Sequence, residues 1–96
     1  MRRNELQRQA REYITSIAYM YLNGAHDVGA GDYPKLTEKE WIDYILREWE
    51  IDVAHNMGVN GQEFRHLRFF GKQAFIDEIR KVVAEDEDVR QWTVEV

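Results

Sequence analysis

The sequence contains no cysteine, a single proline, a single serine and no long run of apolar residues. Without cysteine there can be no disulfide scaffold, no thiolate zinc site and no cysteine nucleophile. Without a long apolar run there is no candidate membrane-spanning helix, and the charged start of the chain does not resemble a secretory leader. We therefore expect a cytoplasmic protein that does not engage a membrane.

Motifs for catalysis and nucleotide binding are also missing. Ser16 lies within a predicted helix and is expected to pack between helices rather than to act as a nucleophile. Gly29 and Gly31 lack the third glycine and the preceding strand of a dinucleotide-binding fingerprint. The segment 70–73 lacks the other parts of a phosphate loop. We therefore predict a protein that is not an enzyme and needs no cofactor.

Apolar residues are present in sufficient number for one core. They make up 44% of the 96 residues, and aromatic residues make up 12%. A chain of this size buries about 65% of the surface that its unfolded form exposes, which is enough for one domain. No internal repeat or low-complexity tract divides the chain, so we predict a single domain over residues 1–96.

Apolar side chains recur at three- and four-residue spacing in four stretches, which predicts amphipathic helices. The first stretch is expected to stop at Gly24 and to be followed by a long loop over residues 24–36. The second begins with a capping box formed by Thr37 and Glu40, and is expected to end at Gly58.

The second half of the sequence predicts two further helical stretches. One opens at Asn60, and the other follows an interruption at Gly71. The last helix should end at the acidic run 85–88, because carboxylates are unfavourable beside the negative end of a helix dipole. Residues 89–96 are rich in strand formers but have no evident partner strand, so we expect an extended tail that packs Trp92 on the bundle. The predicted fold is all-α, a compact bundle of three to four helices with a short extended C-terminal tail.

Charge is distributed in blocks of alternating sign. The net charge of the chain is −5. Residues 1–24 carry a net +2, residues 25–60 a net −5, residues 61–84 a net +2 and residues 85–96 a net −4. An acidic protein repels phosphate backbones, which argues against non-specific binding to nucleic acid.

The two acidic blocks are predicted to form binding surfaces on the second helix and at the end of the last one. Carboxylates spaced over rigid helices can imitate the phosphates of a duplex and occupy a basic groove on another protein. The alternative is a solvated helix face that keeps a small protein soluble. The predicted protein-binding residues are Glu38, Glu40, Asp43, Glu48, Glu50, Asp52, Glu85, Asp86, Glu87 and Asp88.

These features predict a non-enzymatic interaction module, monomeric or homodimeric, whose protein partner has a basic surface. In size and charge alone, the chain is similar to small acidic phage and mobile-element products that block restriction or CRISPR effectors. The concrete expectation is therefore an inhibitor of a nucleic-acid-handling protein, of the anti-CRISPR or anti-restriction type, which could act as a DNA mimic.

A first alternative is a helical regulator that binds nucleic acid directly. Arg65, Arg68 and Lys72 recur at spacings that align them along a continuous helix. They could contact phosphates, and Phe69 could stack on a base. The acidic run that follows them is unfavourable beside DNA, so this interpretation ranks second.

A second alternative is a helical-bundle metalloprotein. Asp52 with His55 and Glu63 with His66 both place an acid three residues before a histidine, which puts two ligands on one helical face. The high share of acidic residues makes this spacing common by chance, and the stripe positions facing the core are apolar. No residue is therefore assigned as a metal ligand.

Overall fold

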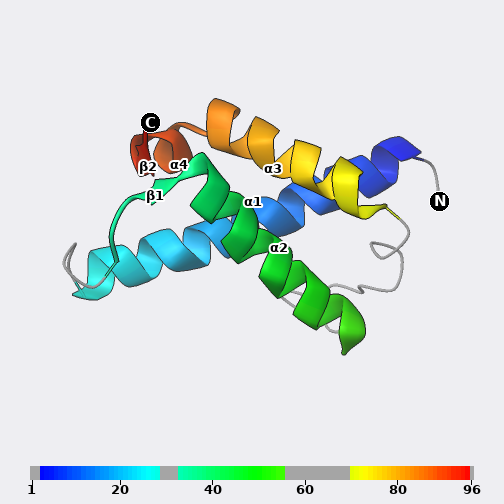
Figure 1. Ribbon diagram of the computed structural model, residues 1–96, viewed down its shortest axis with the longest axis horizontal. Coiled ribbons are helices and arrows are strands. Elements are labelled where there is room, and N and C mark those ends of the chain that lie inside the picture. Colours follow the sequence, from blue (N-terminus) through cyan, green and yellow to red (C-terminus); the bar gives the residue numbers. More distant parts are fainter. Residues whose placement is uncertain (1–2, 29–32, 56–69, 96) are drawn as a thin grey trace.

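The computed structural model describes residues 3–28, 33–55 and 70–95. In these residues the chain forms four helices and one pair of short strands (Figure 1). In chain order the elements are α1 (Arg3–Val28), β1 (Leu36–Thr37), α2 (Glu38–Ala54), α3 (Lys72–Glu85), α4 (Glu87–Gln91) and β2 (Thr93–Val94). The mainly helical architecture confirms the predicted fold class, and no helix in the described part of the chain is long and apolar enough to cross a membrane.

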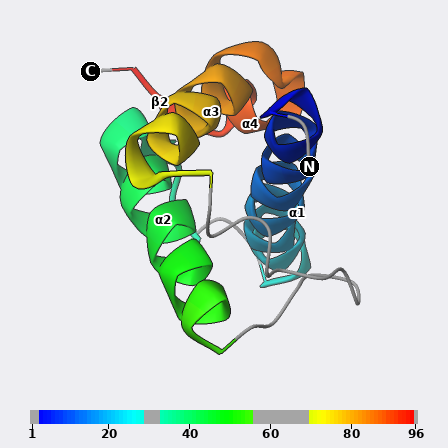
Figure 2. The same cartoon turned by 90° about the vertical axis from the view of Figure 1, so that its right-hand side faces the viewer.

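The core lies between the three long helices. Helix α3 packs against both α1 and α2, and Figure 2 shows it lying across the top of the other two. The apolar stripes predicted from the sequence meet there, since Ile14 of α1, Ile45 of α2 and Ile79 of α3 have no exposed surface. The rings of Trp49 and Phe75 stack with their centroids 4.5 Å apart. Burial of these apolar side chains is the main driving force for folding.

Helix α1 is longer than predicted. It continues past Gly24 to Val28, so the expected stop at Gly24 is wrong and the connection to β1 is shorter than the predicted loop. Gly24 lies inside the helix, where a Cβ would be 3.0 Å from the ring of Tyr33. Tyr33 also packs edge-on against Tyr21, with ring centroids 5.2 Å apart. The glycine therefore permits a close side-chain approach instead of ending the helix.

Helix α2 begins as the sequence predicts. The Thr37 hydroxyl accepts a hydrogen bond from the Glu40 backbone N–H at 3.1 Å, and the Glu40 carboxylate accepts one from the Thr37 N–H at 3.0 Å. This reciprocal pair is the predicted capping box, which satisfies two N–H groups that the first turn would leave unpaired. The helix extends to Ala54. The predicted end at Gly58 and the third helix expected from Asn60 fall outside the described residues.

Helix α3 also has the predicted boundaries. Gly71, the interruption seen in the sequence, precedes the helix with a φ of 95°, which residues with a Cβ rarely adopt. The helix ends at Glu85, within the acidic run. The predicted start of α3 after Gly71 and its predicted end at the acidic run are therefore both confirmed.

The C-terminal segment differs from the extended tail expected over residues 89–96. Its first part forms the short helix α4, and only Thr93–Val94 is a strand. This strand has the partner that the sequence did not reveal, because β2 pairs in parallel with β1, with Leu36 opposite Thr93. Trp92 is half-buried against the core, as expected. The two strands connect the end of the chain to the start of α2.

Candidate protein-interaction surface

Two acidic segments that lie far apart in the sequence meet at one end of the molecule. The pairing of β1 with β2 places the start of α2 beside the C-terminal segment, with Thr37 opposite Val94. Figure 1 shows α4, β2, β1 and the first turn of α2 together at this end. We call this region the acidic end, and define it by six carboxylate residues: Glu38, Glu40, Glu85, Asp86, Glu87 and Asp88.

The acidic run is held by the boundary between α3 and α4. Asp86 follows the last residue of α3 and caps α4, because its carboxylate accepts a hydrogen bond from the Val89 backbone N–H at 3.2 Å. Glu87 and Asp88 occupy the first turn of α4, and both are exposed. Carboxylates that are unfavourable at the C-terminus of one helix are favourable at the N-terminus of the next. Glu87 and Asp88 are therefore attached to ordered helical backbone at this boundary.

Tyr19 of α1 connects the acidic run to the bundle. Its hydroxyl lies 3.0 Å from Asp86 Oδ2 and 3.3 Å from Asp88 Oδ2 and donates to these carboxylates. Burial, followed by the hydrogen bond to Asp86, raises the pKa of Tyr19 to about 12. The phenol therefore stays protonated at neutral pH, and its single hydroxyl hydrogen is shared between the two carboxylates.

The carboxylates of the acidic end differ in how strongly they are neutralised. Glu85 forms an ion pair with Arg11, and Glu38 Oε1 lies 3.6 Å from Arg80 Nε. Glu87 and Asp88 form no ion pair within the described part of the chain. Exposed pairs of this kind contribute at most about 1 kcal/mol, so Arg11 and Arg80 remain able to exchange partners. The two carboxylates of α4 are therefore less neutralised by ion pairs than Glu38 and Glu85, although α4 also carries the exposed Arg90.

Further along α2 the predicted acidic surface is mixed. Asp43 and Arg47 are both exposed and stand one turn apart. Glu50 Oε1 lies 3.7 Å from Lys72 Nζ on α3. Glu48 is only half-exposed. The outer face of α2 therefore alternates in sign and does not extend the acidic end as a continuous negative surface.

Asp52, another predicted binding residue, has a structural contact. Its Oδ2 accepts a hydrogen bond of 2.6 Å from the hydroxyl of Tyr13, a residue of α1 with no exposed surface. Burial, and then this hydrogen bond, raise the pKa of Tyr13 well above its usual range. Replacing Asp52 would remove the acceptor of a buried hydroxyl, so this residue is unsuited to a test of surface binding.

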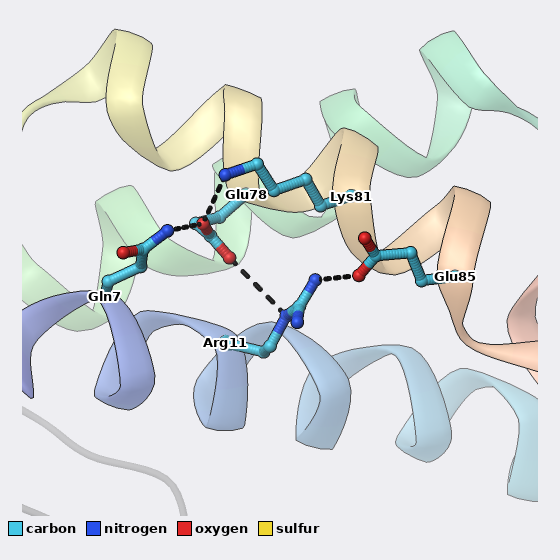
Figure 3. Close-up of polar contacts among 5 residues, drawn as sticks. All are labelled: Gln7, Arg11, Glu78, Lys81 and Glu85. Carbon is cyan, nitrogen blue, oxygen red and sulfur yellow. Dashed lines mark hydrogen bonds and ion pairs between the residues drawn. The ribbon is translucent and has the colours of Figure 1, made fainter. Parts of the chain in front are cut away.

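A second polar cluster joins α1 to α3 and is shown in Figure 3. Its centre is Glu78, which has only 2% of its surface exposed. The carboxylate accepts a hydrogen bond of 2.6 Å from Gln7, lies 3.4 Å from Lys81 Nζ and lies 3.5 Å from Arg11 Nε. Arg11 also contacts Glu85, which links this cluster to the acidic end.

Glu78 is not among the residues predicted from the sequence to be functional. The signal is present nonetheless, because Glu78 stands three residues after Phe75 and four before Val82, on the apolar face of its helix. An acid at such a position needs partners from another helix, since burying an unpaired charge is costly. Glu78 is satisfied by α1 and α3 side chains and serves packing between these helices.

The residues of the nucleic-acid alternative are mostly outside the described residues. Arg65, Arg68 and Phe69 all fall there. Lys72 is exposed at the start of α3 and contacts Glu50, as noted above. The aligned basic face that the sequence predicts therefore stays a prediction.

The metal alternative is only partly covered. Asp52 is engaged by Tyr13, and His55 is exposed just after α2. Glu63 and His66 lie outside the described residues. Within 3–28, 33–55 and 70–95, no group of three or more histidine, aspartate or glutamate side chains is placed to hold a metal ion.

Charge, burial and contacts are the features of this chain from which a function can be inferred. These features concentrate on the acidic end, where exposed carboxylates are presented by helix termini. No protein-family model, no curated protein and no solved structure matches this chain.

Proposed function

We propose that this protein is a non-enzymatic interaction module that binds a basic surface of another protein through its acidic end. The observation that carries the proposal is the pairing of β1 with β2, which joins two acidic segments of distant sequence into one surface. Glu87 and Asp88 supply exposed, uncompensated charge there. A local excess of one sign steers a partner of opposite sign and selects it over acidic surfaces.

The way in which the carboxylates are held also supports binding. Glu40 is oriented by the capping box, and Asp86 by its hydrogen bonds to Val89 and Tyr19. Side chains that are already ordered lose less conformational entropy when a partner binds. The acidic end is therefore better suited to specific recognition than a set of mobile surface glutamates would be.

The partner that we favour is a nucleic-acid-handling protein, with this chain acting as its inhibitor. Grooves that bind a phosphate backbone are lined by lysine and arginine, which pair equally with carboxylates. An acidic end held on helix termini could occupy such a groove in place of nucleic acid. Inhibitors of the anti-restriction or anti-CRISPR type, including DNA mimics, are the concrete form of this proposal.

The test compares two charge variants in affinity capture from a bacterial lysate, run with and without nuclease treatment. Glu38→Lys/Glu87→Lys reverses charge at the acidic end, and we expect it to weaken capture of the partner at least about tenfold. The control, Glu5→Lys/Glu12→Lys, makes the same change in net charge at two exposed positions of α1. The first half of α1 lies toward the opposite end of the long axis (Figure 1).

The outcomes separate the alternatives. Loss of a captured protein with the first variant and retention with the control supports the proposal, and mass spectrometry then names the partner. Equal capture by both variants contradicts it. If all captured material disappears after nuclease treatment, the basic segment that includes Arg65, Arg68 and Lys72 is the working surface instead.

A further inference from the structure

A groove lies between α1 and the C-terminal segment, beside the acidic run. It is lined by Tyr19, Leu22 and Asn23 of α1, and by Asp88, Gln91 and Trp92, and its volume is about 330 Å³. This volume is at the lower end of the range for small-molecule pockets, about 300–1,000 Å³, so the groove has room for one long side chain.

The groove has an apolar part and a polar rim. Leu22 is buried with 6% of its surface exposed, and Trp92 is half-buried beside it. Asn23 and Gln91 are exposed and offer amide groups that both donate and accept hydrogen bonds. This combination suits a side chain with an aliphatic stem and a polar head, attached to an extended main chain.

The negative charge beside the groove favours a side chain with a positively charged head. Asp88 contributes a carboxylate of which one oxygen faces the Tyr19 hydroxyl at 3.3 Å. Asp86 accepts a hydrogen bond from the same hydroxyl, so two carboxylates lie beside this phenol. Two cations belong to the neighbouring segments: Lys35, whose Nζ is 6.0 Å from the centre of the Trp92 ring, and Arg90 of α4. Neither forms an ion pair with Asp88, so the groove retains negative charge.

We infer that this groove is the specific contact site of the acidic end and that it takes an arginine side chain from an extended segment of the partner protein. The inference rests on the proposed function, because it assumes a protein partner with basic groups. The arginine stem lies along Leu22 and Trp92, and its guanidinium donates two hydrogen bonds to Asp88. Arginine is favoured over lysine because its planar fork matches a carboxylate and stacks on aromatic rings.

The direct test is a titration with a capped glycine–arginine–glycine peptide, followed by proton–nitrogen correlation spectra of the full chain. We expect shifts at the Trp92 indole and at the side-chain amides of Asn23 and Gln91, with a Kd of about 1 mM, or about −4 kcal/mol. The matched peptide with citrulline, which keeps the shape of arginine without its charge, should produce no shifts there. Shifts of equal size with both peptides, or none with either, overturn the inference.

Two variants test whether the arginine peptide binds in the groove. Asp88→Asn keeps the side-chain size and should weaken the arginine peptide about tenfold. Gln91→Lys places a cation on the rim at an exposed position and should abolish the binding without disturbing the fold. Asp43→Asn, an exposed carboxylate on α2, is the control and should bind as the parent does.

The captured partner distinguishes this inference from the proposed function. If Glu38→Lys/Glu87→Lys loses the partner but Gln91→Lys keeps it, the acidic end binds without the groove, and only the inference fails. If the partner is lost with both, the groove is confirmed as part of the interface. If the peptide binds but charge reversal leaves capture unchanged, the proposed function fails, and with it the assignment of the groove to a partner.

Discussion

Glu78 shows how one buried charge is accommodated between two helices. A carboxylate removed from water costs several kcal/mol unless charged or polar groups replace its hydration. Gln7 of α1 and Lys81 of α3 supply two of these groups, and the half-exposed Arg11 supplies a third. The carboxylate therefore fixes the relative position of α1 and α3 more than it adds to stability.

We expect Glu78→Ala to lower the free energy of unfolding by about 1–3 kcal/mol, because Gln7 loses its acceptor and the packed space is left partly empty. The change is measured by chemical denaturation followed by circular dichroism. Asp77→Ala, one position earlier on the same helix but exposed, is the control and should change stability by no more than about 0.5 kcal/mol. Equal effects of the two substitutions would mean that burial of Glu78 has no energetic consequence.

At the scale of elements, three helix boundaries have a local cause. The capping box starts α2, Gly71 precedes α3, and the acidic run separates α3 from α4. Asp86 serves both helices, because it follows the C-terminus of α3 and accepts a hydrogen bond from the first turn of α4. An acidic run that stops one helix can therefore start another without an intervening loop.

Gly71→Ala tests the boundary before α3. The φ of 95°, combined with a ψ of 141°, is strained for any residue with a Cβ, so we expect a loss of about 1–3 kcal/mol in the free energy of unfolding. Among the described residues, and apart from the two neighbours of Gly71 in the chain, no atom lies within 4 Å of the added Cβ, so the loss would reflect backbone conformation and not a clash. The measurement is urea denaturation, with Gln73→Ala at an exposed position of the same helix as control. Unchanged stability of Gly71→Ala would show that the backbone can relax to a negative φ at no cost.

At the scale of the whole molecule, one hydroxyl connects the end of the chain to the core. The indole N–H of Trp41, a residue with no exposed surface, donates to Thr93 Oγ1 at 2.9 Å. The same hydroxyl donates to the Val89 carbonyl at 2.6 Å. These bonds, together with the strand pair, hold α4 and β2 against the start of α2.

Thr93→Val removes both hydrogen bonds and keeps the shape of the side chain. We expect a loss of about 1–3 kcal/mol in the free energy of unfolding, because the buried indole N–H of Trp41 is left without its acceptor. Tryptophan fluorescence during denaturation reports the loss. Thr93→Ser keeps the hydroxyl and should restore most of the stability. A serine variant as unstable as the valine variant would assign the effect to the methyl group instead.

Much of the fold could be predicted because its causes are local. The stripes that contain Ile14, Ile45 and Ile79 show helical periodicity, and each of them reaches the core. The capping box at Thr37 needs only residues three positions apart. The predicted stop at Gly24 was wrong because the role of this glycine is not local. The ring that lies against it belongs to Tyr33, which is outside the helix.

The candidate site divides in the same way. Composition and spacing identified the acidic run and the acidic start of α2, since charge can be read directly from residues. They did not reveal that these segments adjoin, because a strand pair of two residues on each side leaves almost no pattern in a sequence. Nor did they show that Asp52 is engaged by Tyr13, a contact across 39 positions.

The sequence by itself therefore determined the helical class, the amphipathic faces, the start of α2, both ends of α3 and the location of negative charge along the chain. These properties follow from periodicity and from interactions within one turn. Only the tertiary structure decided which carboxylates accept hydrogen bonds from other helices, as Glu78 and Asp52 do. It also decided which carboxylates remain exposed, as Glu87 and Asp88 do. The reason is that burial and pairing depend on side chains brought together from distant parts of the chain, and these contacts carry no signal in local spacing.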